Sequence, residues 1–182
     1  MGEDSEDKEV DYILQASAIE ALGALWPSSL TSDRRAVSTC EDTKILLQSM
    51  RLTFSPGGAW TIRVSSLKTI AGVITKLHMD SIDAACMLLI NECIIEGLED
   101  TKYSSVREAA LLVILAIMSH PSLPHFPLSL PFLPQLLVQV QRYVRDGVPR
   151  VAELASTTKG LLEKKLMVTN TGTGHSDSQG DI

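Results

Sequence analysis

Hydrophobic residues recur at intervals of three and four along most of the chain, which is the spacing of helices that bury one face. The segment that begins at Trp60 shows this clearly, with apolar residues at positions 62, 67, 70, 73, 74 and 77. Proline, glycine and polar residues separate such segments, as in SPGG at 55–58 and DGVP at 146–149. The pattern predicts an all-α fold with helices at about 10–25, 34–54, 60–78, 81–97, 104–119, 132–145 and 148–166.

Three segments fall outside the helical pattern. Prolines are too frequent for a helix interior between positions 121 and 134, so residues 120–131 are predicted to form an extended connection. Residues 1–9 are mainly acidic, residues 167–182 are polar and rich in glycine, and we expect both ends to be disordered. The folded part is therefore predicted to be one helical domain over residues 10–166.

One motif recurs along these predicted helices. It reads TIRVSSLKTI at 61–70, SVREAALLVI at 105–114 and VPRVAELAST at 148–157, with Arg63, Arg107 and Arg150 at the same place. The intervals between these arginines are 44 and 43 residues, within the range of about 40–47 residues for repeats built from helix pairs. A fainter copy, ILQASAIEAL at 13–22, has Gln15 at the arginine position. The sequence thus predicts four repeat units, of which the first is incomplete.

The motif resembles the second helix of HEAT repeats, in which a short turn precedes Val-Arg, two further residues and a small one. The residues that match best are Val106, Arg107 and Ala110, followed by Ile62, Arg63 and Ser66, whereas Pro149 and Glu153 depart from the pattern around Arg150. The resemblance covers about residues 10–166. It implies a right-handed α-solenoid of about three and a half armadillo-like, two-helix repeats.

The repeat suggests structural roles for five residues. Helix pairs of a solenoid bury a core only by stacking on their neighbours. We expect Ser66 and Ala110 to let adjacent helices approach, and Arg63, Arg107 and Arg150 to bond acidic side chains or helix-end carbonyls of the next unit.

Outward polar positions of the second helices are the candidates for contact with a partner. They are Glu20, Lys68, Glu108 and Glu153, and the alternative for each is a merely solvated position. The first unit has no helix before its only helix, so an apolar face is expected to remain uncovered. We therefore expect the chain to belong to a longer solenoid or to pack against another subunit.

Charge disfavours some classes of function. The net charge is −6, of which −5 lies in the first eleven residues, and no block of Lys and Arg suits broad nucleic-acid binding. The longest apolar run, 109–118, is half of the roughly 20 residues needed to cross a membrane. With acidic first residues and no signal-type segment, we expect a cytoplasmic location and the nucleus as a second one.

Candidate catalytic groups are few. Cys86 and Cys93 lie among apolar residues and are interpreted as core. His120 and His125 flank the proline-rich connection, and with Cys40 or a carboxylate they could form a nucleophile–base or metal pair. No established catalytic, phosphate-binding or metal-binding motif is present in the sequence. We expect no cofactor and no metal, and a Cys/His enzyme is only a remote alternative.

These observations predict a non-enzymatic scaffold or adaptor that binds proteins through a helical-repeat surface. The imperfect repeats, the proline-rich connection and the polar C-terminal stretch resemble the C-terminal part of the large HEAT-repeat proteasome adaptor and scaffold family. That resemblance implies binding to the proteasome, with a role in its assembly or quality control. The alternatives are HEAT-type nuclear transport receptors and phosphatase or kinase scaffolds.

Overall fold

The computed structural model of the chain describes residues 3–26, 40–54, 59–77, 82–120 and 132–171. All regular elements in these ranges are helices, which confirms the prediction of an all-α protein. The helices are α1 (Glu3–Leu25), α2 (Cys40–Leu52), α3 (Trp60–Ile74), α4 (Ala84–Leu98), α5 (Ser104–Met118), α6 (Leu133–Tyr143) and α7 (Pro149–Thr171).

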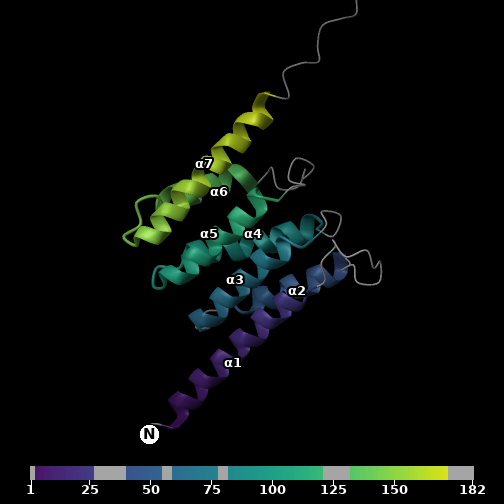
Figure 1. The fold of residues 1–182 in the computed structure, drawn as a ribbon, viewed down its shortest axis with the longest axis vertical. Helices are drawn as coiled ribbons and strands as arrows, with labels where there is room; N and C mark the ends of the chain where they lie inside the picture. Colours follow the sequence, from purple (N-terminus) through teal and green to yellow (C-terminus); the bar gives the residue numbers. More distant parts are fainter. Residues whose placement is uncertain (1–2, 27–39, 55–58, 78–81, 121–131, 172–182) are drawn as a thin grey trace, which may run out of the picture.

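The helices are arranged in two layers. Helices α1, α3, α5 and α7 pack one against the next and form what we call the odd layer, which rises from α1 to α7 in Figure 1. Helices α2, α4 and α6 pack in the same succession and form the even layer. The layers are joined where α2 meets α3, α4 meets α5 and α6 meets α7. Each described helix after α1 therefore has neighbours within its own layer and across the layers.

The core runs between the two layers and is centred on α3, α4 and α5. The largest side chains with almost no exposed surface include Leu67, Ile70, Ile90, Ile94, Leu111 and Ile114. These three helices are 15 residues long, a length at which an isolated helix is marginal in water. Burial of their apolar faces therefore supplies most of their stability.

The observed ends of the first and last helices differ from the predicted ones. Helix α1 begins at Glu3 and includes most of the segment 1–9 for which we expected disorder. This segment has no proline or glycine after Gly2, and acidic residues are favourable near a helix N-terminus. Helix α7 continues to Thr171, beyond the predicted end at 166, because no glycine or proline occurs between that position and Gly172.

The start of α4 is determined by a capping hydrogen bond. The predicted start was residue 81, but Asp83 is the N-cap and α4 begins at Ala84. The Asp83 carboxylate accepts a hydrogen bond of 2.8 Å from the Cys86 amide, which satisfies one of the free N–H groups of the first turn. The predicted start of α2 and residues 121–131 of the predicted connection 120–131 lie outside the described residues.

Candidate functional site

Arg107, at the start of α5, is bound to two turns. Its Nε and Nη2 donate to Oδ2 and Oδ1 of Asp146, at 2.9 and 3.1 Å. Its Nη1 donates to the carbonyl of Asp100 at 2.8 Å, and Asp146 Oδ1 also accepts from the Val148 amide at 2.8 Å. The side chains of Arg107 and Asp146 are only 11% and 8% exposed. This nearly buried guanidinium joins α5 to the turn before it and to the turn before α7.

Arg63, at the start of α3, makes the corresponding contact one step earlier in the odd layer, between α3 and the turn before α5. Its Nη1 lies 2.6 Å from Oδ2 of Asp100, in the turn between α4 and α5. Oδ1 of Asp100 accepts from the amides of Lys102 and Tyr103 at 2.9 and 2.7 Å. Arg63 Nε has no hydrogen-bond partner among the described residues, so this pair has poorer geometry than Arg107 and Asp146. In both steps an arginine reaches the aspartate that orders the next turn.

Arg150 is placed differently from the other two arginines. Its side chain is half exposed and lies 3.4 Å from Glu108 Oε1 and 3.1 Å from Glu153 Oε2. Helix α5 begins at Ser104 and α7 at Pro149. Counted from these starts, five buried positions coincide, namely Val106, Ala109, Ala110, Val113 and Ile117 in α5 and Val151, Leu154, Ala155, Thr158 and Leu162 in α7, while α5 also buries Leu111 and Ile114. The structure therefore puts Ala152, not Arg150, where α5 has Arg107. Pro149 explains the shift, because it occupies the first position of α7 and so sets where that helix begins.

The small residues of the motif are buried where the layers approach each other. Ser66 Oγ lies 2.8 Å from Thr53 Oγ1, just after α2, within hydrogen-bond distance. Ala110 faces the end of α4, where a Cβ on Gly97 would lie 2.9 Å from the Cβ of Ala110 and 3.0 Å from Cδ1 of Leu67. A larger side chain at position 66 or 110 would separate the even helix from the odd helix that follows it.

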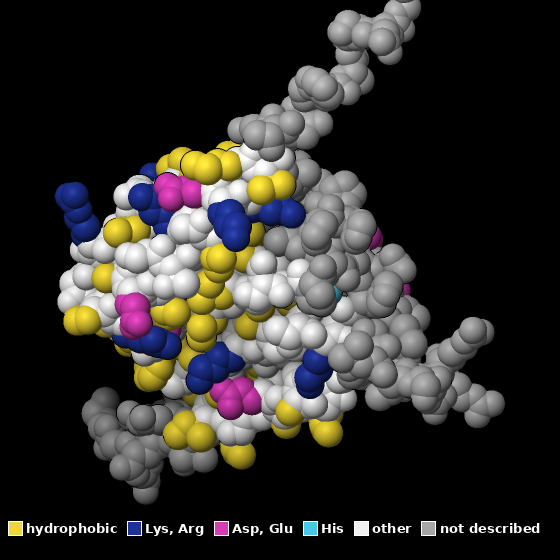
Figure 2. All heavy atoms as spheres, turned by 45° about the horizontal axis from the view of Figure 1, so that its top comes forward, with side chains coloured by type: hydrophobic (Ala, Val, Ile, Leu, Met, Phe, Trp, Pro, Cys, Tyr) yellow, Lys and Arg dark blue, Asp and Glu magenta, His cyan; other side chains and the backbone are white. Residues whose placement is uncertain are grey.

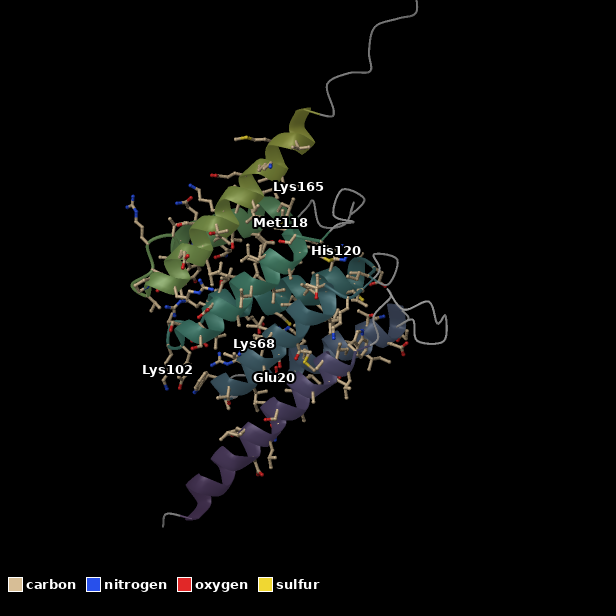
Figure 3. The ribbon with its side chains drawn as sticks, viewed as in Figure 1. Glu20, Lys68, Lys102, Met118, His120 and Lys165 are labelled. Carbon is tan, nitrogen blue, oxygen red and sulfur yellow. The ribbon has the colours of Figure 1, made fainter. Side chains whose placement is uncertain are left out.

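His120, the candidate catalytic histidine, follows the C-terminal end of α5, whereas the three arginines lie near the N-terminal ends of their helices. Nε2 of His120 is 3.2 Å from the carbonyl of Leu77, just after α3, and Figure 3 shows it at the far end of α5 from Lys102. Lys76 has a similar place one step earlier, where Nζ donates to the carbonyls of Gly23 and Ala24 at 3.0 and 2.9 Å. His120 thus contacts the segment that directly follows α3.

The other members of the suggested Cys/His site are not brought together in the described part of the structure. His125 lies outside the described residues, as does the side chain of Cys40. Cys86 and Cys93 are buried in α4 as thiols, with no disulfide between them. Burial raises the pKa of the Cys93 thiol to about 12, although the nearby Arg51 guanidinium acts in the opposite direction. Cys93 is therefore a protonated, unreactive core residue at neutral pH.

In a Cys40→Ser chain, neither remaining thiol should react with an aromatic disulfide reagent at pH 8 while the protein is folded. Both should react at once in urea, because unfolding restores access and an ordinary pKa. The unfolded Cys93 thiol titrates near 9.0 and the folded one at about 12, so the unfolded state loses its proton first. Stability should consequently fall as pH rises above 9. Rapid native labelling of Cys93 would contradict this assignment.

A groove lies between α1 and α3 on the outer surface of the odd layer. Its volume is about 260 Å³, and its lining includes Ile13 and Glu20 of α1 and Trp60, Val64 and Lys68 of α3. Figure 3 shows Glu20 and Lys68 close together on these neighbouring helices. Glu20 accepts a 2.8 Å hydrogen bond from Ser65, whereas exposed Lys68 has no ion pair with any described residue. We call this the α1–α3 groove.

Aromatic rings extend this groove toward α5. The Trp60 ring stacks on that of Tyr103, with centroids 5.5 Å apart and planes 19° apart. Arg63 and Lys102 lie over the Tyr103 ring, at 6.0 and 5.0 Å from its centroid. The sequence interpretation missed both rings. The available signal was that two of the few aromatic residues stand just before the arginine in successive copies of the motif.

The four outward residues chosen from the sequence form two groups. Glu20 and Lys68 share the α1–α3 groove, and Glu108 and Glu153 meet around Arg150 between α5 and α7. Figure 2 shows a face on which basic and acidic side chains lie next to each other, with hydrophobic side chains between them. That face therefore carries no large block of one charge.

Comparison with known proteins gave no match to a family model, a curated protein or a solved structure. Within the described ranges, no group of three or more His, Cys, Asp or Glu residues is arranged to hold a metal ion. In the same ranges, none of the helices combines the length and apolar character required to cross a membrane.

Proposed function

We propose that the protein is a non-enzymatic scaffold of HEAT-like helical repeats that binds partner proteins through the odd layer. The support is the succession of odd helices, each packed on the next, with Arg63 and Arg107 bonding the following turn. In this proposal the chain forms a right-handed solenoid whose units are α2–α3, α4–α5 and α6–α7, preceded by α1. The arginines and small residues fix the spacing of the units, and the outer surface of the odd layer binds the partner protein.

The proposed binding site for the partner is the α1–α3 groove. It combines exposed apolar surface, from Ile13 and Trp60, with a lysine that has no acidic partner in the described structure. At about 260 Å³ it is smaller than a typical pocket for a drug-sized ligand. One or two side chains of a protein segment would fill it. The complementary segment has an apolar anchor next to an acidic residue that pairs with Lys68.

The resemblance noted in the sequence makes the proteasome the specific partner to test, with assembly or quality control as the role. The same groove would serve a nuclear transport or phosphatase scaffold, because fold alone does not assign a partner. The identity of the protein retained by the groove decides between these classes. In this proposal the protein acts in the cytoplasm and nucleus.

Lys68→Glu should reduce retention of the partner at least tenfold, because it places a second carboxylate beside Glu20 and repels the acidic residue of the partner. The measurement is affinity purification of the tagged chain from cell extract, quantified by mass spectrometry with proteasome subunits as the expected class. Lys164→Glu makes the same charge change on an exposed position of α7 and should have no effect.

Three results would count against the proposal in different ways. Equal retention by the wild-type, Lys68→Glu and Lys164→Glu chains would exclude the α1–α3 groove as the site. If Lys68→Glu reduced retention of a complex other than the proteasome, the protein would still be a scaffold, but the proteasome would be excluded as its partner. Turnover of a substrate that depends on His120 would contradict the non-enzymatic assignment.

A further inference from the structure

Helix α1 exposes apolar side chains at positions that the next two odd helices bury. Alignment of Gln15 with Arg63 pairs Leu14 with Ile62, Leu22 with Ile70 and Leu25 with Val73. The exposed fractions are 63, 44 and 82% for Leu14, Leu22 and Leu25, and 7, 0 and 1% for Ile62, Ile70 and Val73. Their counterparts in α5, Val106, Ile114 and Ile117, are buried as well. The repeat thus has the same apolar face in all three helices and leaves it uncovered only in α1.

The even layer accounts for this difference. Helix α3 packs against α2 and α4, and α5 packs against α4, in addition to their odd neighbours. Helix α1 packs chiefly against α3. The exposed face of α1 would therefore be covered by a helix in the even layer that packs against α1 in the way that α4 packs against α5. Figure 1 shows the N-terminal half of α1 extending beyond the helices that pack on it.

A second groove marks the place of this missing helix. It lies between α1 and α2, has a volume of about 280 Å³ and includes Leu22, Trp26, Ile45 and Leu46 in its lining. Ile45 of α2 is itself 53% exposed. Apart from α1 itself, this α1–α2 groove shares no lining with the α1–α3 groove, so the two surfaces are independent.

We propose that the α1–α2 groove binds an amphipathic helix of a partner protein, which lies antiparallel to α1 and completes the even layer. The direction follows from the paired helices α4 and α5, which are joined by the short turn 99–103 and so run antiparallel. The apolar stripe of the partner covers Leu22 and Ile45 in the groove and the exposed Leu25 at the end of α1, between the lining residues Leu22 and Trp26 in sequence. Helix-in-groove binding of this kind needs apolar anchors at intervals of three and four residues.

Charge defines the partner further. The first eleven residues, most of which lie in α1, carry a net charge of −5. An antiparallel helix places its C-terminal half beside this segment, so basic residues are expected in that half. A second copy of this chain is disfavoured as the occupant, because its own first residues are equally acidic and its net charge is −6. Charge thus favours a basic amphipathic helix of a partner protein over a second copy of this chain.

The test uses two synthetic helical peptides of identical composition, with a leucine stripe and with lysines either in the C-terminal or in the N-terminal half. Fluorescence anisotropy with the full chain should show tighter binding of the first peptide, and the difference should shrink with added salt. Leu22→Asp and Leu25→Asp should each weaken binding at least tenfold. Leu25 is 82% exposed in the unbound chain, so Leu25→Asp should change the thermal melt little, whereas Leu22 is 44% exposed and its variant should be compared at equal folded fraction.

Leu88→Asp is the matched control, because Leu88 is similarly exposed but lies on α4 outside the groove. It should leave peptide binding unchanged. Lys68→Glu should do so too, so a failure of the α1–α3 groove proposal can be told apart from a failure of the α1–α2 groove proposal. Three results would overturn the inference: no binding of either peptide, equal binding by the wild-type and Leu25→Asp chains, or a stable homodimer in sedimentation that Leu25→Asp dissociates. The last result would identify a second copy as the occupant.

Discussion

Arg107→Ala should lower the free energy of unfolding by about 3–5 kcal/mol, the usual effect of removing one partner of a buried ion pair. The substitution would leave Asp146 nearly buried without its cation, and it would remove the donor to the Asp100 carbonyl. Two turns would lose their common contact at once. The loss arises from the geometry at the end of α5, since three nitrogens of one side chain are engaged there.

Urea denaturation followed by circular dichroism measures this effect, with Arg150→Ala as the matched control. Arg150 is half exposed and its ion pairs lie at the surface, where water and salt screen them, so its removal should leave the urea midpoint nearly unchanged. Arg107→Lys should be intermediate, because lysine keeps the charge but cannot bond both carboxylate oxygens and the carbonyl in the same planar geometry. Equal midpoints for the Arg107→Ala and Arg150→Ala chains would contradict the structural role of Arg107.

Gly97→Ala should destabilise the protein by about 2 kcal/mol, although alanine is the better helix former by about 1 kcal/mol. The new methyl group would lie 2.9 Å from the Cβ of Ala110 and 3.0 Å from Cδ1 of Leu67. The side chains of both neighbours are buried, and the Ala110 Cβ cannot move without its backbone. Helix α4 would therefore have to withdraw from α3 and α5, which loosens the contact between the layers.

Gly160→Ala provides the opposite expectation within the same chain. Gly160 lies inside α7, and a Cβ there would meet no atom within 4 Å. Alanine should therefore stabilise the protein by about 0.5–1 kcal/mol through helix propensity alone. Thermal melts of the two variants should move in opposite directions. A rise in melting temperature for both would show that α4 can shift at no cost and that the close approach at Gly97 is not required.

These contacts connect the fold to the proposed binding surfaces. The arginine–aspartate contacts and the buried small residues set how far each helix pair lies from the next. Trp60 belongs to the same region, since its ring stacks on Tyr103 in the turn that Arg63 contacts through Asp100. The α1–α3 groove is thus bordered by residues whose positions depend on the repeat contacts. Loosening the stack at Arg107 and blocking the groove at Lys68 should be separable by comparing stability with binding.

The sequence predicted the parts that depend on local periodicity. The helical class and the approximate place of every described helix follow from apolar spacing and from breakers such as DGVP. Glu20 and Lys68 were chosen as outward positions of two helices, and the structure brings them into one groove. The register of α7 could not be obtained in this way. The motif aligned Arg150 with Arg107, whereas burial aligns Ala152 with it, because the position of Pro149 determines where α7 starts.

By itself, the sequence determined which residues can form helices, which faces of those helices are apolar and where the recurring arginines lie. These are properties of single segments, and the periodic spacing of residues is enough to predict them. Only the tertiary structure decided that Arg107 meets Asp146, that His120 contacts the carbonyl of Leu77 and how far each apolar side chain of α1 is exposed. Each of these depends on which helices become neighbours and at what depth. The physical reason is that one apolar stripe is buried in α3 and α5 and exposed in α1, according to whether a second layer covers it.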